Sequence, residues 1–472
     1  MTNKTALHSK ISPNSPVGIP KLLSYFFPEL ITAWVLYIGL EIIDFRFIAC
    51  IDVPSCSTTL AVSNNILHLI TKVAEGFSVG MVILCGQHNG AQEYRRTGKI
   101  LTTGIWMTAF IGGLIALSIY SNAHAIYSFY EVSDFVIDLG VPFLRIRVIG
   151  VFFSFIYFVL IGFLRGIKNT QAPMILFLLG ALVFLYFDYA LIFGAWGFPA
   201  LGLKGSAIAT VLQYAFMLCG ALLYIFFSPH HKKYHLSLFS TMSVPHMREL
   251  FRISWPVMID KASIAFCPNL LTKLLGTTAR LANLSTGPLL LDSYTVLRIM
   301  ERIGILPAVA FAQVITFLVS NDYKVHHFKA IKRNIVLVLA LATLFVGFST
   351  LLFCLWPTFF LSMLGKEKAY NSYIAYSLPY IAFTIFFDVT QLILSASLRG
   401  AADVKTVMWT RVLFTVFFFT PLAYGIAFMP IQNPLLKFVL LYSSAHLNFA
   451  LMSFVYYLRL RWNTWKKQSI EE

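Results

Sequence analysis

The sequence predicts an all-α membrane protein with twelve transmembrane helices in two pseudo-symmetric six-helix bundles. Three observations support this prediction. Hydrophobic residues make up 58% of the 472 positions and charged residues only 12%, whereas about a quarter of residues are charged in soluble domains. The apolar runs last about 20–28 residues, the length that an α-helix needs to cross a bilayer. Landmarks also recur in the two halves at a nearly constant offset, as expected of an internal repeat.

Apolar runs between polar breaks predict each element in order. Residues 1–20 form an expected cytoplasmic segment, residues 21–228 an N-terminal bundle, residues 229–247 a cytoplasmic linker, residues 248–460 a C-terminal bundle and residues 461–472 a cytoplasmic tail. The expected helices of the first bundle are 22–45, 60–86, 101–120, 136–162, 171–194 and 204–227. Those of the second bundle are 249–275, 292–320, 335–356, 372–396, 404–428 and 435–458.

The basic residues predict the orientation of these helices. Most of the 36 lysine and arginine residues fall at the termini or in even-numbered loops, and few fall in odd-numbered loops. Because cytoplasmic loops carry an excess of basic residues, we expect both termini to be cytoplasmic and the chain to lie in the plasma (inner) membrane. This pattern also accounts for the net charge of +16, so no nucleic-acid partner is expected.

Enzymatic and metal-binding motifs are absent from the sequence. It contains no H-E-x-x-H motif, no Walker loop, no C-x-x-C pair and no recognisable Ser-His-Asp spacing. We therefore expect no catalytic residue, no metal site and no cofactor. Cys50 and Cys56 share an expected outer loop; two free thiols are the simpler interpretation, and a disulfide is the alternative.

The repeat is parallel, because six spans per half return the chain to the same side of the membrane. Leu-Arg-Gly at residues 164–166 recurs at residues 398–400, an offset of 234. The pair Lys72 and Glu75 recurs as Arg298 and Glu301 at an offset of 226. Two bundles facing each other follow, with the substrate expected near the midplane of their interface.

Three aspartates lie within expected helices: Asp44 in the first, Asp188 in the fifth and Asp388 in the tenth. A charged side chain at the bilayer centre costs about 2.5–3.5 kcal/mol on insertion scales, so each must be paired, protonated or facing water. A low-dielectric site favours the protonated carboxyl and a nearby cation favours the ionised form, so such a group can exchange a proton for a cation. A helix-helix hydrogen bond is the alternative role for each aspartate.

The charged pairs have two interpretations as well. Lys72 and Glu75, like Arg298 and Glu301, are three residues apart and share one helix face. Each pair either forms a structural ion pair or lines the cavity between the bundles. Gln391 is a further candidate for a polar side chain in that cavity.

Four stretches resemble the multidrug and toxic compound extrusion (MATE) family. They are Gly-Gln-His-Asn-Gly-Ala at residues 86–91, the segments 162–173 and 187–210, and residues 388–400, which end in the second Leu-Arg-Gly. The resemblance extends over about residues 17–460. It implies two six-helix bundles in a V shape that export organic cations or other amphiphiles in exchange for H⁺ or Na⁺.

The resemblance also assigns residues. Asp44, Asp188 and Asp388 match acids of the family and are the expected cation-coupling residues. Phe184 stands where many members have an Asn, and Ile264 stands near the place of a family Glu. A divergent member with a changed, anionic substrate also fits these departures. A small-molecule substrate, the lipid bilayer and a monomeric state are expected.

Other functions remain open from the sequence. A flippase for lipid-linked precursors belongs to the same superfamily and would need a cleft rich in cationic residues. A membrane-embedded transferase or hydrolase would need a catalytic cluster near one membrane face. A transport-inactive receptor would show no ion-dependent flux.

Overall fold

The computed structural model describes most of the chain. Its described residues are 17–35, 39–51, 56–130, 132–237, 243–264, 266–281, 287–363, 372–431 and 433–467. Within them every regular element is helical, which confirms the predicted all-α class. Ten helices of this described part are long and apolar enough to cross a membrane. The two other expected spans, the first and the seventh, each consist of two shorter helices.

The first half follows the expected spans within a few residues. Its short helices α5 (Ala123–Phe129), η2 (Ala195–Gly197) and α9 (His230–Tyr234) were not expected, because they are too short for an apolar run to reveal them. The longer helices are α1 (Ile19–Trp34), α2 (Leu40–Ala49), α3 (Cys56–Gly90), α4 (Tyr94–Ser121), α6 (Asp134–Gly166), α7 (Gln171–Phe193) and α8 (Leu203–Phe227).

The second half repeats this pattern. Its helices are α10 (Val244–Ile264), α11 (Phe266–Leu281), α12 (Gly287–Tyr323), α13 (Phe328–Leu355), α14 (Pro357–Met363), α15 (Ser372–Gly400), α16 (Val404–Leu413), the π-helical turn η4 (Phe414–Phe419), α17 (Thr420–Phe428), α18 (Pro434–Arg461) and η5 (Thr464–Lys467). The expected helix 404–428 therefore contains a wide turn. Pro421 lacks the N–H that the Phe417 carbonyl would accept in an α-helix, which accounts for the π-helical hydrogen bonding just before it.

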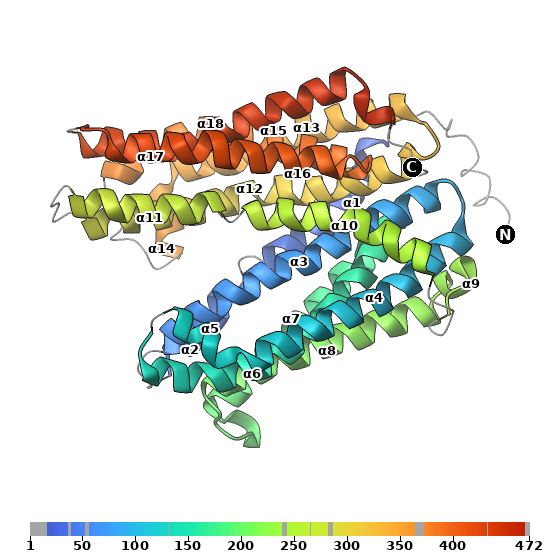
Figure 1. The fold of residues 1–472 in the computed structure, drawn as a ribbon, viewed down its shortest axis with the longest axis horizontal. Coiled ribbons are helices and arrows are strands. Elements are labelled where there is room, and N and C mark those ends of the chain that lie inside the picture. The colour runs from blue at the N-terminus through green and yellow to red at the C-terminus, as the bar shows by residue number, and fades with distance from the viewer. Residues whose placement is uncertain are drawn as a thin grey trace.

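The helices form two lobes arranged as a V (Figure 1). Helices α2 to α8 make one lobe and α11 to α18 the other. The lobes meet near the two termini, which we call the closed end, and diverge toward α2 and α11, which we call the open end. This arrangement matches the V shape that the family resemblance implied.

The first helix of each half packs against the opposite lobe. Leu22 and Phe26 of α1 belong to a buried cluster made otherwise by the second half, and Phe26 stacks on Phe311 of α12 at 3.9 Å between ring centroids. Conversely, Leu250 and Val257 of α10 lie in the buried cluster of the first lobe. The two lobes are thereby joined by α1 and α10 as well as by α3 and α12.

Close contacts of α3 depend on glycines. A Cβ at Gly80 would lie 2.2 Å from the Ser254 hydroxyl of α10, and one at Gly90 would lie 1.8 Å from the Asn321 carbonyl oxygen of α12. Small residues permit such backbone approach between membrane helices. The glycines thus position α3 against α10 and α12 of the second half.

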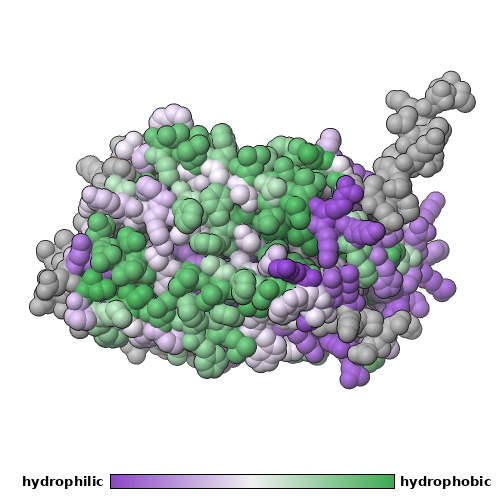
Figure 2. Space-filling view, turned by 90° about the horizontal axis from the view of Figure 1, so that it is seen from above, coloured by the Kyte–Doolittle hydropathy of each residue, from purple (hydrophilic) through white to green (hydrophobic). Residues whose placement is uncertain are grey.

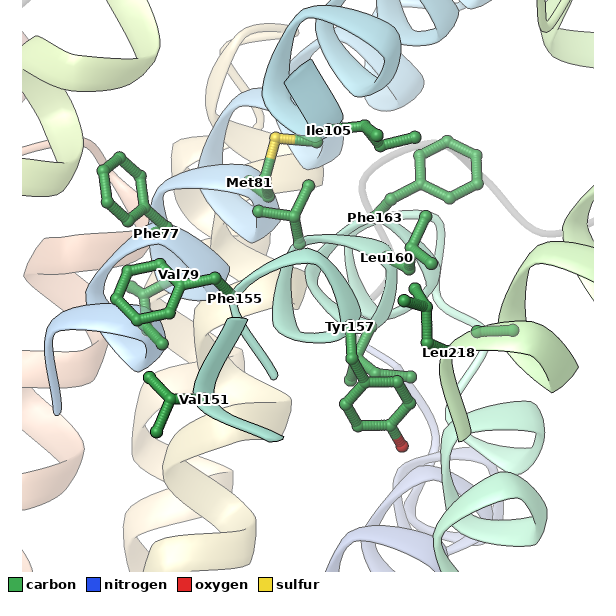
Figure 3. Close-up of a cluster of buried hydrophobic side chains, with 14 of the residues drawn as sticks. Phe77, Val79, Met81, Ile105, Val151, Phe155, Tyr157, Leu160, Phe163 and Leu218 are labelled. Atoms are coloured by element: carbon green, nitrogen blue, oxygen red, sulfur yellow. The ribbon is translucent and has the colours of Figure 1, made fainter. Parts of the chain in front are cut away.

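Hydrophobic side chains fill the lobes and also cover their outside. Phe77, Phe155 and Phe163 lie in the packed core of the first lobe (Figure 3). Phe110 and Phe417 are exposed, as expected of side chains that face lipid. Figure 2 shows apolar residues over most of one face and hydrophilic residues gathered at the closed end.

Backbone geometry fixes the register of the repeat. Gln92 and His326 both have positive φ, and so do Lys168 and Ala402; the members of each pair are 234 residues apart. The offset of the Leu-Arg-Gly motif is therefore confirmed. The offset of 226 that equated Glu75 with Glu301 is wrong by eight residues, or about 12 Å along a helix, so these two glutamates are not structural counterparts.

Candidate functional site

The structure brings two of the three predicted aspartates together in the first lobe. The Ser206 hydroxyl of α8 donates a hydrogen bond to Asp44 Oδ1 of α2 at 2.8 Å, and Arg147 Nη1 of α6 lies 4.0 Å from Asp44 Oδ2. Asp188 of α7 is fully buried and interacts electrostatically with Asp44 and Arg147. Ser206 also acts on Asp188, but its single hydroxyl proton is donated to Asp44, and neither carboxylate oxygen of Asp188 has a partner at hydrogen-bond geometry within the described part of the chain.

This arrangement is chemically incomplete when both aspartates are ionised. The Asp188 carboxylate then has no hydrogen-bond partner among the described residues, and a buried, uncompensated charge is costly. A proton or a metal cation bound between them would remove the imbalance. Phe184, one helical turn before Asp188, is buried and supplies no polar group, so the amide that many family members place there is not replaced by another ligand at this position.

Asp388 lies in the other lobe, apart from this pair. It is partly buried on α15 and interacts electrostatically with Glu301, His446 and Arg298. Its neighbour Glu301 accepts hydrogen bonds from Arg298 at 2.9 Å and from the Tyr442 hydroxyl at 2.5 Å, and Glu301 Oε1 lies 3.4 Å from His446 Nε2. Each lobe therefore contains its own buried acidic cluster, which a grouping of three aspartates from the sequence did not anticipate.

A buried triad stands beside the second cluster. Asp260 of α10 accepts a hydrogen bond from Arg399 Nη1 at 2.6 Å and another from Arg411 Nε. All three side chains are almost completely buried. The sequence does not reveal this triad, because Asp260 and Arg411 are 151 positions apart. Ile264, near the family's glutamate position, is 42% exposed on the same helix.

A cavity lies between the two halves, where α1, α3, α6, α10 and α12 approach each other. About 730 Å³ of space not filled by protein atoms lies here, open solvent included. Glu29, Glu75, Arg165 and Lys261 line it, together with Gln313 and apolar side chains. Of the predicted site residues only Glu75 is among its lining residues. Glu29, Arg165 and Lys261 were missed because their partners lie more than 100 residues away in sequence.

The acidic groups of this cavity are paired with basic ones. Arg165 binds Glu29 with two hydrogen bonds of 2.8 and 2.7 Å. Glu75 accepts a hydrogen bond from Lys72 at 2.6 Å and lies 3.6 Å from Lys261 Nζ. Lys72 and Glu75 thus form the expected ion pair. The pair Arg298 and Glu301 also forms, but in the second lobe and not across the same cavity.

Two remaining predictions concern single residues. Gln391 is buried on α15, and its Nε2 has no hydrogen-bond partner within the described ranges. Cys50 and Cys56 are free thiols, as the simpler interpretation held.

The closed end is held by polar contacts between the lobes, which we call the clasp. Lys324, after α12, donates to both carboxylate oxygens of Glu93 at 2.8 Å, and Asn89 donates to Asn321 at 2.8 Å. Burial raises the pKa of Glu93, but the hydrogen bonds and charge of Lys324 outweigh this and hold it below its usual value. The carboxylate therefore stays ionised and paired at neutral pH.

Two helical lobes joined at one end, with a polar cavity between them, are the architecture of a polytopic membrane transporter. Comparison with known families agrees. The MatE family model matches residues 30–190 and 269–425, once in each half. These segments make up more than half of the chain, which therefore belongs to the MatE family.

Named relatives are distant. A "Probable multidrug resistance protein NorM" of Idiomarina loihiensis is 22% identical over 349 residues, 73% of both chains. Its counterpart in Thermotoga maritima is 24% identical over 204 residues, and one in Xylella fastidiosa is 28% identical over 210 residues. The chain spans less than half the length of these last two relatives. All three are named as resistance proteins and not as enzymes, in agreement with the expectation from the sequence.

Solved structures share the fold. An outward-facing multidrug resistance MATE family transporter of the MOP superfamily has a TM-score of 0.81 and 15% identity, with 97% of this chain and 98% of that chain covered. A MOP superfamily transporter from Pyrococcus furiosus has the same score, identity and coverage. That transporter is described as having a binding pocket of reverse polarity, which suggests a different function for it. At this identity the likeness establishes the two-lobed fold alone.

Proposed function

We propose that this chain is a secondary antiporter that exports organic cations or other amphiphilic compounds in exchange for H⁺ or Na⁺. Membership of the MatE family and the names of its relatives support transport. The two-lobed fold supports alternating access, in which the lobes rock about the junction that contains the cavity.

The observation that carries the coupling is the pair Asp44 and Asp188. Asp188 is fully buried, and its carboxylate oxygens have no hydrogen-bond partner in the described part of the chain. Asp44 is satisfied by Ser206 and lies at the edge of the reach of Arg147. The pair thus resembles a site that a monovalent cation or a proton completes. Asp388, which interacts with Glu301 in the other lobe, is the third proposed coupling residue.

Coupling follows if the ion binds the two conformations with different affinity, because a ligand shifts an equilibrium only by that difference. A cation at Asp44 and Asp188 contacts α2, α7 and α8 at once. It therefore favours the conformation in which these helices lie close together. Substrate in the cavity acts on the same equilibrium from the junction of the lobes.

The direction of transport rests on orientation. Basic residues predict that the termini, and hence the closed end, face the cytoplasm, and Figure 2 places the hydrophilic side chains there. The open end then faces outward, as required for release of exported substrate. We accordingly place the chain in the plasma (inner) membrane as a monomer.

Flux in proteoliposomes tests the proposal. We expect Asp188→Asn to abolish efflux of rhodamine 123 or fluorescein driven by an imposed pH or Na⁺ gradient, because the amide cannot take up the coupling charge. Asp138→Asn is the matched control, since Asp138 is exposed near the start of α6. Gradient-driven efflux that persists in Asp188→Asn and in Asp44→Asn would refute these two aspartates as the coupling site.

A further inference from the structure

The cavity between the lobes contains a lysine with little compensating charge. Lys261 Nζ lies 3.6 Å from Glu75 Oε2, whereas Lys72 Nζ hydrogen-bonds the other oxygen of Glu75 at 2.6 Å. One carboxylate neutralises one ammonium group, and the shorter contact belongs to Lys72. Glu75 therefore neutralises the charge of Lys261 less completely than the charge of Lys72.

The neighbouring acid, Asp260, acts on Lys261 less strongly than Glu75, Arg399 and Lys72 do. Asp260 precedes Lys261 on α10, but Arg399 and Arg411 already bind its two carboxylate oxygens. Lys261 is also within electrostatic reach of Arg399 and Lys72, both of them cations. The α10 side of the cavity thus has an excess of positive charge among the described groups, and an excess charge away from bulk water is unfavourable until a counter-charge binds.

The remaining surface of the cavity suits an apolar molecule. Phe158, Ile161, Phe177 and Val309 line it, and Tyr157 and Gln313 add polar groups. In the other charged pair of the cavity, Arg165 and Glu29 neutralise each other through two hydrogen bonds. Among the described residues that line the cavity, Lys261 is accordingly the cation most open to pairing with a ligand.

We propose that the inter-lobe cavity binds an amphiphile with an anionic head, a carboxylate or a phosphate, and that Lys261 is its anchor. This inference rests on the proposed transport function and narrows its substrate to the anionic class. A charge-assisted hydrogen bond from Lys261 to the head offsets the excess positive charge, and the aromatic side chains take the apolar body. Organic cations meet the ammonium group of Lys261 here and are disfavoured.

Binding to purified protein in neutral detergent tests the inference without any ion gradient. The probe is fluorescein, an anionic dye, and its fluorescence anisotropy reports binding. We expect Lys261→Gln to weaken binding by about tenfold or more, Lys261→Arg to keep it within a few-fold, and Lys204→Gln, at an exposed lysine outside the cavity, to leave it unchanged. Binding that is equal in wild type and Lys261→Gln would overturn the proposal.

Competitors with matched tails define the head group. Dodecanoate and dodecyl phosphate should displace fluorescein, and dodecyltrimethylammonium should not. The relative potency of the two anions distinguishes a carboxylate from a phosphate, whereas displacement by the ammonium compound alone would contradict the anionic class.

A second variant separates this inference from the proposed function. Asp188→Asn should keep fluorescein binding and lose gradient-driven flux, because Asp188 is absent from the residues that line the cavity. Wild-type flux that neither a pH gradient nor a Na⁺ gradient drives would count against the antiporter. Fluorescein binding that does not depend on Lys261 would count against the anionic substrate.

Discussion

The buried aspartates of the two lobes differ in the charged groups around them. Asp44 and Asp188 share one nearby arginine, whereas Asp260 is shared by two arginines. We propose that a cation completes the first arrangement, whereas the second is an ion pair of one carboxylate with two arginines. In this proposal the same residue type serves ion binding in one lobe and structural pairing in the other.

At the residue scale, Asp260→Asn should destabilise the protein. Removing one partner from a buried ion-pair network leaves unpaired charges and costs about 3–5 kcal/mol, and Arg399 and Arg411 would both lose their carboxylate. A lower melting temperature in detergent is the expected result.

The double variant Asp260→Asn with Arg411→Met should recover part of this loss, because it removes one of the two stranded charges. Asp138→Asn, which is exposed, should melt like wild type. An unchanged melting temperature in Asp260→Asn would show that this triad does not hold α10 against α15 and α16.

At the scale of helices, sequence reasoning succeeded where one helix carries the whole signal. Apolar runs predicted the spans, and residues three apart predicted the pairs Lys72–Glu75 and Arg298–Glu301. It failed where a prediction depended on how residues of two different helices correspond in space. The equivalence of Glu75 and Glu301 was wrong because the positive-φ positions set the repeat at 234 residues, and a two-charge motif is too short to fix a register.

The packing of α3 against α12 gives a prediction for the closed end. In Gly90→Ala the new methyl group would lie 1.8 Å from the Asn321 carbonyl oxygen, so the two backbones must move apart at a typical overpacking cost of about 1–3 kcal/mol. We expect this variant to open the closed end. Spin labels at the exposed positions 95 and 329 would report a longer distance between the lobes.

Gly276→Ala in α11 is the control, since a Cβ there meets no atom within 4 Å. It should leave the distance distribution unchanged. An unchanged distance distribution in Gly90→Ala would mean that the lobes tolerate a methyl group at position 90 without moving apart.

At the scale of the whole molecule, the sequence predicted an all-α, two-lobed membrane protein, and the helices and family match confirm it. It could not predict which charges meet. Glu29 with Arg165, Glu301 with Tyr442 and Asp260 with Arg411 are separated by 136, 141 and 151 positions. Such contacts depend on how helices rotate and tilt in the assembled lobes, which apolar periodicity does not encode.

In the proposed mechanism, the charged groups inside the lobes and those in the cavity between the lobes have different roles. We propose that coupling ions bind in the interior of a lobe and that the substrate binds in the cavity where α1, α3 and α10 meet. The two ligands then act on one conformational equilibrium from separate places, so each can be removed by mutation while the other still binds.

The central claim is that Asp44 and Asp188 bind the coupling ion, and direct ion binding tests it. Purified wild-type protein and the double variant Asp44→Asn with Asp188→Asn would be compared for proton uptake on acidification and for retention of radioactive Na⁺. We predict that the wild type and the Asp138→Asn control take up one of these ions and that the double variant loses that uptake. Equal uptake by the double variant and the wild type would contradict the account.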